Sequence, residues 1–90
     1  MYSIEYTNRF RKDLLRCKKQ GKDLELLKSV IKQLDTDSKL HRKYRLLKLV
    51  EPYAGWWECH VQNDWLLVWC QYDYRLQMLM TNTGSHSELF

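Results

Sequence analysis

Long apolar runs are missing from this sequence, and their absence limits where the protein can act. No segment approaches the roughly 20 consecutive apolar residues of a membrane-spanning helix. The start, MYSIEYTNRF, also lacks the apolar core of a secretory signal peptide. We therefore expect a soluble protein of the cytoplasm that has no membrane partner.

Glycine, proline and cysteine are scarce as well, with three, one and three residues among the 90. The apolar content of 44% and the aromatic content of 13% exceed those of disordered chains, which predicts one folded domain over residues 1–90. The odd number of cysteines, without metal-type spacing, indicates reduced and partly buried thiols at Cys17, Cys59 and Cys70. We expect neither a metal ion nor a cofactor.

Basic residues are nearly absent from the second half of the chain. Residues 49–90 contain Arg75 alone against five acidic residues, a net charge of −4. Residues 1–48 contain 14 basic and six acidic residues, a net charge of +8. A basic region of this size suits a polyanion or an acidic protein partner, although a solvated helix face is the plainer interpretation.

The first half of the chain has the pattern of a strand followed by two helices. Residues 2–6 alternate and carry β-favouring side chains, which predicts a short strand. Thr7 or Asn8 can cap the first helix, Gly21 fits its end, and Asp23 can cap the second. The tight junction at Gly21 predicts a helical hairpin. The apolar stripes of the two helices are Phe10, Leu14 and Cys17, and Leu24, Leu27, Val30, Ile31 and Leu34.

After a loop over residues 35–43, the hydrophobic period changes toward two, which is typical of strands. Residues 44–50 form at best a short strand or an extended segment. Better strands are predicted over residues 56–61, 65–72 and 76–81, followed by a loop at residues 83–85 and a short tail at residues 86–90. The order β-α-α-β-β-β predicts an α+β fold, with the helical hairpin packed on one face of a mostly antiparallel sheet.

Alternation within the strand at residues 56–61 assigns its side chains to two faces. Trp57, Cys59 and Val61 form the more apolar face, which we expect to contact the helices, and His60 then points to the open face. Asp64 lies across the next turn, and His86 lies just past the last strand. Two histidines and a carboxylate can therefore converge on one surface.

Such a set suits RNA cleavage that uses no metal. A base removes the proton of the 2′-hydroxyl and an acid protonates the departing 5′ oxygen, and histidine suits both roles because its pKa is near neutrality. A cation must also offset the charge that develops on the phosphorus centre. Of the four tryptophans, we expect Trp56 to be the exposed one and the others to lie in the core.

Each of these residues also has a plainer interpretation. A strand histidine is more often a surface or packing residue, an Asp in an Asn-Asp turn usually serves the turn, and a histidine near the chain end is often merely solvated. A metal site of two histidines and an aspartate is a further alternative, but the spacing matches no standard ligand pattern.

Two segments resemble the YafQ-type toxins of the RelE superfamily. Residues 57–69, WECHVQNDWLLVW, resemble the family's central motif of a His, three residues, an Asp, a bulky residue and a hydrophobic strand. Residues 84–90, GSHSELF, resemble the family's ending. The resemblance covers the whole chain, is specific in its C-terminal half, and implies a RelE-like fold.

The resemblance implies the toxin of a type II toxin–antitoxin system, an endoribonuclease that cleaves mRNA, typically on the translating ribosome. Its inhibitor would be a cognate antitoxin, which we expect to be of the ribbon-helix-helix type. By motif, His60, Asp64, His86 and Phe90 correspond to active-site positions of the family. His86 is then the candidate general acid, His60 with Asp64 the candidate for activating the 2′-hydroxyl, and Phe90 a stacking platform for the substrate nucleotide.

The sequence departs from the family in two respects. A further active-site histidine usually precedes the central motif, but counting back from His60 reaches Leu47 or a neighbour, and His41 lies several residues earlier. RelE relatives also often place Arg or Lys around the site, whereas the motif strands contain only Arg75.

Either two histidines suffice, or a basic residue such as Lys48 or Arg45 takes part of the missing role. We predict that Lys43, Arg45 and Lys48, the cations nearest to the motif in sequence, contact phosphate, with Arg75 and Trp56 as further RNA-binding residues. An alternative is an inactive relative that binds RNA or an antitoxin. A DNA-binding protein is a weaker alternative, since no segment resembles a recognition helix.

Overall fold

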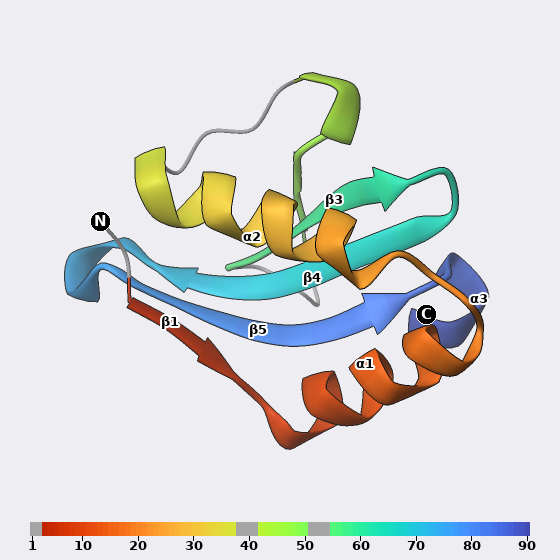
Figure 1. The fold of residues 1–90 in the computed structure, drawn as a ribbon. Helices are drawn as coiled ribbons and strands as arrows, with labels where there is room; N and C mark the ends of the chain where they lie inside the picture. Colours follow the sequence, from red (N-terminus) through yellow and green to blue (C-terminus); the bar gives the residue numbers. More distant parts are fainter. Residues whose placement is uncertain (1–2, 38–41, 51–54) are drawn as a thin grey trace.

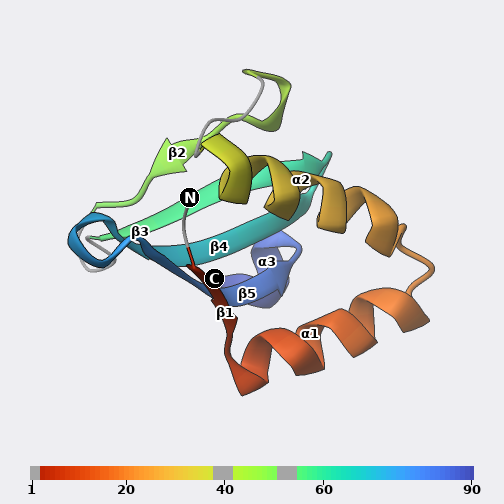
Figure 2. The same ribbon diagram turned by 60° about the vertical axis from the view of Figure 1, so that its left-hand side comes forward.

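The computed structural model describes residues 3–37, 42–50 and 55–90. Its helices and strands are β1 (Ser3–Tyr6), α1 (Asn8–Lys19), α2 (Leu24–Asp37), β2 (Leu47–Lys48), β3 (Trp56–Gln62), β4 (Trp65–Tyr72), β5 (Gln77–Gly84) and α3 (His86–Leu89), with short 3₁₀ turns η1 (Arg42–Tyr44) and η2 (Asp73–Arg75). The sheet has the order β1-β5-β4-β3-β2 (Figures 1 and 2). Among these strands β1 and β5 pair in parallel and the other pairs are antiparallel, which confirms the predicted α+β class.

Local capping explains where the two long helices begin and end. Thr7 Oγ1 accepts a hydrogen bond of 3.0 Å from the backbone N–H of Phe10, which satisfies a donor of the first turn of α1. Gly21 follows α1 with a φ of +80°, a backbone conformation that glycine adopts without strain. Asp23 Oδ1 accepts the N–H of Glu25 at the start of α2. The capping roles predicted for Thr7 and Asp23 are confirmed.

Both helices bury their apolar stripes against the same face of the sheet. Figure 2 shows α2 running over β3 and β4, while α1 lies beside β5. Trp57, Cys59 and Val61 face these helices, as their alternation predicts, and β4 is the central strand, as its apolar run predicts. The core joins Phe10 and Cys17 of α1 and Leu27, Val30 and Leu34 of α2 to Cys59, Val61, Trp65, Leu67, Trp69, Met78 and Met80 of the sheet.

The three cysteines are free and buried. Burial raises the pKa of the Cys59 thiol to about 12, and it also raises the pKa of Cys17 and Cys70. Because the thiolate is the reactive form, these thiols serve packing rather than chemistry. No helix in the described ranges is both long and apolar enough to cross a membrane.

The predicted end of the chain is wrong in two respects. The last strand continues past Thr81 to Gly84, because Thr83 and Gly84 still pair with Leu67 and Leu66 of β4. The expected loop at residues 83–85 is therefore mostly strand. Residues 86–89 form the helix α3 rather than an irregular tail.

Helix α3 begins with a capping box. Ser85 Oγ accepts the N–H of Glu88, and Glu88 Oε1 accepts the N–H of Ser85 at 2.8 Å. The signal is present in the sequence as Ser-x-x-Glu, but a helix of four residues is too short to show the apolar periodicity that would support it.

Candidate active site

His60 lies on the open face of β3, beside a bulge that separates it from Gln62 in the ladder to β4. Its Nδ1 is 2.8 Å from the backbone carbonyl oxygen of Asn63. A carbonyl only accepts, so Nδ1–H donates and the neutral ring keeps its lone pair on Nε2. Asn63 has a φ of +38°, a turn conformation that asparagine tolerates and that aims this carbonyl at the ring.

Asp64 joins the β3–β4 turn to the start of α3. Its Oδ1 accepts the backbone N–H of His86 at 3.1 Å and lies 3.5 Å from His86 Nδ1. The side chains of His86 and Asp64 are 57% and 66% exposed, so a ligand from solvent can reach both. One carboxylate oxygen therefore binds the backbone N–H of His86 and also lies within ion-pair distance of its ring.

Three of the predicted residues form a continuous row of rings. The ring centroids of His60 and His86 are 6.3 Å apart, and those of His86 and Phe90 are 6.0 Å apart. This spacing lets two imidazoles address opposite sides of one phosphodiester group, with an aromatic ring beside them. The structure thus brings together His60, Asp64, His86 and Phe90, as the sequence predicts.

A polar network that the sequence analysis did not identify holds α3 against α1. Asp13, which is 4% exposed, accepts the N–H of Thr83 at 3.1 Å and a hydrogen bond from Arg16 Nη1 at 2.7 Å. Arg16 Nη2 donates to the Thr83 carbonyl at 2.6 Å. Arg16 Nε lies 3.2 Å from Glu88 Oε2, an ion pair without the alignment of a hydrogen bond.

Gly84 is required by the close packing of this network. A Cβ atom at this position would overlap Arg16 Nη2 and come within 2.9 Å of Glu88 Oε1. Arg16 cannot simply move away, because Asp13 and Thr83 hold its guanidinium. The glycine therefore allows Arg16 to contact the strand and the helix that present His86.

Glu88 makes the attachment of α3 sensitive to acid. The N–H of Ser85 and the amide of Gln20 donate to its carboxylate, and with Arg16 nearby they lower the pKa of Glu88 from 4.5 to about 2. A lowered pKa stabilises the folded state above the ordinary value, and this contribution disappears as the pH falls from about 4.5 to about 2.

We expect Glu88→Gln to lower the melting temperature at pH 6 and to have little effect at pH 2. Thermal unfolding of both proteins across this range measures the difference. Glu25→Gln is the control, since Glu25 pairs with Lys28 on an exposed helix face and its side chain is 80% exposed. A Glu88→Gln effect of equal size at both pH values would contradict this role of the charge.

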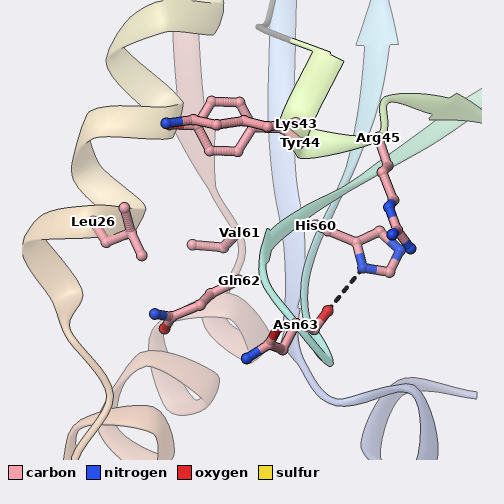
Figure 3. Close-up of a pocket in the computed structure, with 8 residues that line it drawn as sticks. All are labelled: Leu26, Lys43, Tyr44, Arg45, His60, Val61, Gln62 and Asn63. Carbon is pink, nitrogen blue, oxygen red and sulfur yellow. Dashed lines mark hydrogen bonds between the residues drawn. The ribbon is translucent and has the colours of Figure 1, made fainter.

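A basic pocket of about 340 Å³ adjoins His60 at the edge of the sheet. Figure 3 shows Arg45 extending toward the His60 ring, and Lys43 reaching across Tyr44, whose ring centroid is 5.1 Å from Lys43 Nζ. Arg45 therefore lies beside His60, as predicted, whereas Lys43 lines the same pocket with its ammonium directed away from His60 toward α2 (Figure 3). The pocket is lined by Leu26, Lys43, Tyr44, Arg45, His60, Val61, Gln62 and Asn63.

The other two predicted cations lie elsewhere. Lys48 Nζ is 5.7 Å from the ring centroid of Trp57, which places Lys48 on the helix side of β3 rather than beside His60. The guanidinium of Arg75 lies 4.9 Å from the Tyr72 ring centroid, in the η2 region at the end of the sheet opposite α3 (Figure 1).

The remaining residues that the sequence analysis names are Leu47, His41 and the two tryptophans at the start of β3. Leu47 pairs opposite Glu58, so it lies on the same face as His60 and no histidine takes its place. Trp56 is half-buried rather than exposed, as is Trp57. His41 lies outside the described residues. Within residues 3–37, 42–50 and 55–90, no three His, Cys, Asp or Glu side chains gather as a metal-ligand group.

Comparisons with known proteins cover nearly the whole chain. A family model described as "Bacterial toxin of type II toxin-antitoxin system, YafQ" matches residues 2–90. A relative from Escherichia coli (strain B / BL21-DE3), named mRNA interferase toxin YafQ, is 32% identical over 88 residues, which are 97% of this chain and 94% of the relative.

Solved structures agree with this match. A metal-bound toxin from Helicobacter pylori superposes with a TM-score of 0.91 at 38% identity, covering 100% of both chains. A chain of the E. coli DinJ-YafQ complex superposes with a TM-score of 0.91 at 30% identity, covering 100% of this chain and 99% of that chain.

Proposed function

Because the chain belongs to the YafQ family of bacterial type II toxins, we propose that it cleaves mRNA on the translating ribosome by acid–base catalysis at His60 and His86. Its endoribonuclease activity follows from the family and from the relatives named mRNA interferase. The observation that supports the chemistry is the row of His60, His86 and Phe90, whose neighbouring ring centroids are 6.3 and 6.0 Å apart.

His60 suits the role of general base. Its Nδ1–H is engaged by the Asn63 carbonyl, so Nε2 is available to take the proton of the 2′-hydroxyl. The 2′ oxygen then forms a bond to phosphorus, and the bond between phosphorus and the 5′ oxygen breaks. The products are a 2′,3′-cyclic phosphate and a 5′-hydroxyl.

His86 suits the role of general acid. Its Nδ1 faces the carboxylate of Asp64 at 3.5 Å, which pairs with the protonated ring. The opposite nitrogen, Nε2, carries the proton that the departing 5′ oxygen receives. Asp64 therefore acts by positioning and by charge, without exchanging a proton with the substrate.

The surroundings of the two histidines supply charge and stacking. Arg45 adjoins His60 and offsets the negative charge that grows on the phosphate oxygens, and Lys43 adds positive charge to the same pocket. Phe90, which is 53% exposed, offers its ring to a base next to the scissile bond. No step in this mechanism requires a metal ion.

The experiment that tests this function is cleavage of an mRNA in a translation extract, with the cut sites mapped. The protein should cut mRNA on ribosomes, and it should cut the same RNA without ribosomes much more slowly. A chelator of transition-metal ions, at constant Mg²⁺, should leave the rate unchanged. Equal cutting of ribosome-free RNA would refute the ribosome dependence, and loss of cutting with the chelator would refute the metal independence.

The partner we propose is a cognate antitoxin of the ribbon-helix-helix type, and the place of action is the cytoplasm. The support comes from the similar E. coli protein, whose structure is known in the DinJ-YafQ complex. The exposed side of α1, a helix with six basic residues and one acidic residue, offers an acidic antitoxin a complementary surface. Co-expression of this chain with the protein encoded beside it should yield a stable complex and remove the toxicity.

Leu47 favours a second candidate, an inactive relative that only binds RNA or the antitoxin. This leucine occupies the open face at the position where the family's additional histidine is expected. Expression without a partner separates the two functions. An active enzyme arrests growth, whereas a binding module leaves growth unchanged.

A further inference from the structure

A second pocket lies on the other side of the row of rings, away from Lys43 and Arg45. Its volume is about 130 Å³, and its lining joins two aromatic rings, an arginine and an amide. Phe90 belongs both to this pocket and to the row of rings, so the pocket continues directly from His86. The lining residues are Arg9, Trp56, Val68, Asn82, Leu89 and Phe90.

The groups in this pocket match the parts of one nucleotide. The rings of Trp56 and Phe90 offer stacking surfaces, which every base can use. The side-chain amide of Asn82 offers a donor and an acceptor to a base edge. The volume is close to that of an apolar cavity of about 150 Å³ that holds benzene, so the pocket has room for one base ring and not for two stacked bases.

Among the described residues that line this pocket, Arg9 is the only cation. It comes from the first turn of α1, far from the active-site motifs in sequence. Its side chain is 59% exposed, and its Nε lies 3.9 Å from Asp13 Oδ2, a distant and solvent-screened pair. The guanidinium can therefore turn toward a phosphate at little cost, and its planar donors suit phosphate oxygens.

We propose that this pocket binds one base of the RNA substrate and that Arg9 binds the phosphate attached to it. The inference rests on the proposed ribonuclease function and extends it. Arg45 contacts the RNA strand beside His60, and Arg9 contacts it beyond Phe90. The scissile phosphate then lies between Arg45 and Arg9. Because β3, β4 and β5 contain no Lys or Arg, Arg9 supplies the positive charge on the Phe90 side.

The first test compares Arg9→Ala with Arg11→Ala, which removes the same charge from an exposed position of α1 outside the pocket. We expect Arg9→Ala to reduce mRNA cleavage about tenfold, in line with the loss of one charged contact, while Arg9→Lys retains part of the activity. Arg11→Ala should stay within about twofold of the wild type, and all three should melt at the wild-type temperature.

The second test measures binding of a short single-stranded RNA to variants that also contain His86→Ala. Arg9→Ala should lower the slope of log affinity against log salt by about 0.7, the value for one lost phosphate contact on a single strand. RNA should quench tryptophan fluorescence in these proteins, and Trp56→Phe should remove the quenching while Trp57→Phe keeps it.

The results separate this proposal from the function on which it rests. If the wild type cuts no RNA, the proposed function fails, and the binding data still decide whether the pocket holds a nucleotide. The pocket proposal is overturned if Arg9→Ala and Arg11→Ala lower cleavage or the salt slope equally, or if RNA quenching persists in Trp56→Phe.

Discussion

His86→Ala should lower the rate of mRNA cleavage by roughly 100-fold or more, since positioned acid–base groups contribute about 10² to 10⁴ in rate. The ring of His86 is largely exposed and its backbone N–H still donates to Asp64, so the fold of the variant should be unchanged. Single-turnover cleavage in a translation extract measures the loss. Ser87→Ala, an exposed neighbour on α3, is the matched control.

A modified substrate distinguishes the acid from the base. An RNA in which sulfur replaces the 5′-bridging oxygen has a leaving group that departs without a proton. His86→Ala should cut this RNA nearly as fast as the wild type does, whereas His60→Ala should stay slow. Equal rescue of both variants, or of neither, would refute the division of roles between the two histidines.

Asp13→Ala should destabilise the protein by about 3 to 5 kcal/mol, the usual cost of removing one partner of a buried ion pair. The substitution leaves the Thr83 N–H and the Arg16 guanidinium without their buried acceptor. For a domain of this size, in which 1 kcal/mol shifts the midpoint by about 4 to 8 °C, the melting temperature should fall by roughly 12 to 40 °C. Thermal unfolding followed by circular dichroism measures it.

The milder variant Asp13→Asn tests the same network in a protein that still folds. It keeps an acceptor for Thr83 and loses the charge that Arg16 pairs with, so its melting temperature should fall between those of the wild type and Asp13→Ala. Glu25→Ala is the control on an exposed pair and should shift the midpoint by little. Wild-type stability in Asp13→Ala would refute the structural role of the network.

Local patterns are sufficient to predict β1, α1, β3 and β4, and with them the position of His60 in the site. The alternation over residues 56–61 put Trp57 toward the helices and His60 on the open face, because strand parity is a local property. The apolar run of residues 65–72 placed β4 at the centre of the sheet. The pairing of β3 with β4 and of β4 with β5 then brings Asp64 and His86 together.

The positions of four charged residues could not be predicted, because they depend on contacts between parts of the chain that are distant in sequence. Proximity in sequence suggested Lys48 and Arg75 as phosphate ligands, but strand parity turns Lys48 toward Trp57, and Arg75 follows the hairpin to the far end of the sheet. Arg9 and Asp13 belong to a helix with many charged residues, and nothing in the local pattern distinguishes them from their solvated neighbours. Their roles depend on contacts with β5, about 70 residues later.

The parallel pairing of β1 with β5 has a consequence for the order in which a newly made chain gains its activity. Thr7 bonds to Thr81, Asp13 to Thr83 and Glu5 to Gln77, contacts that span 74, 70 and 72 residues. Synthesis proceeds from the N-terminus, so β1 and α1 cannot pack against β5 until almost all of the chain has been translated. Contacts of such long range also slow the folding of a small domain. The network that holds α3 and His86 against α1 therefore forms only at the end of synthesis, so the nascent chain lacks a complete active site until then.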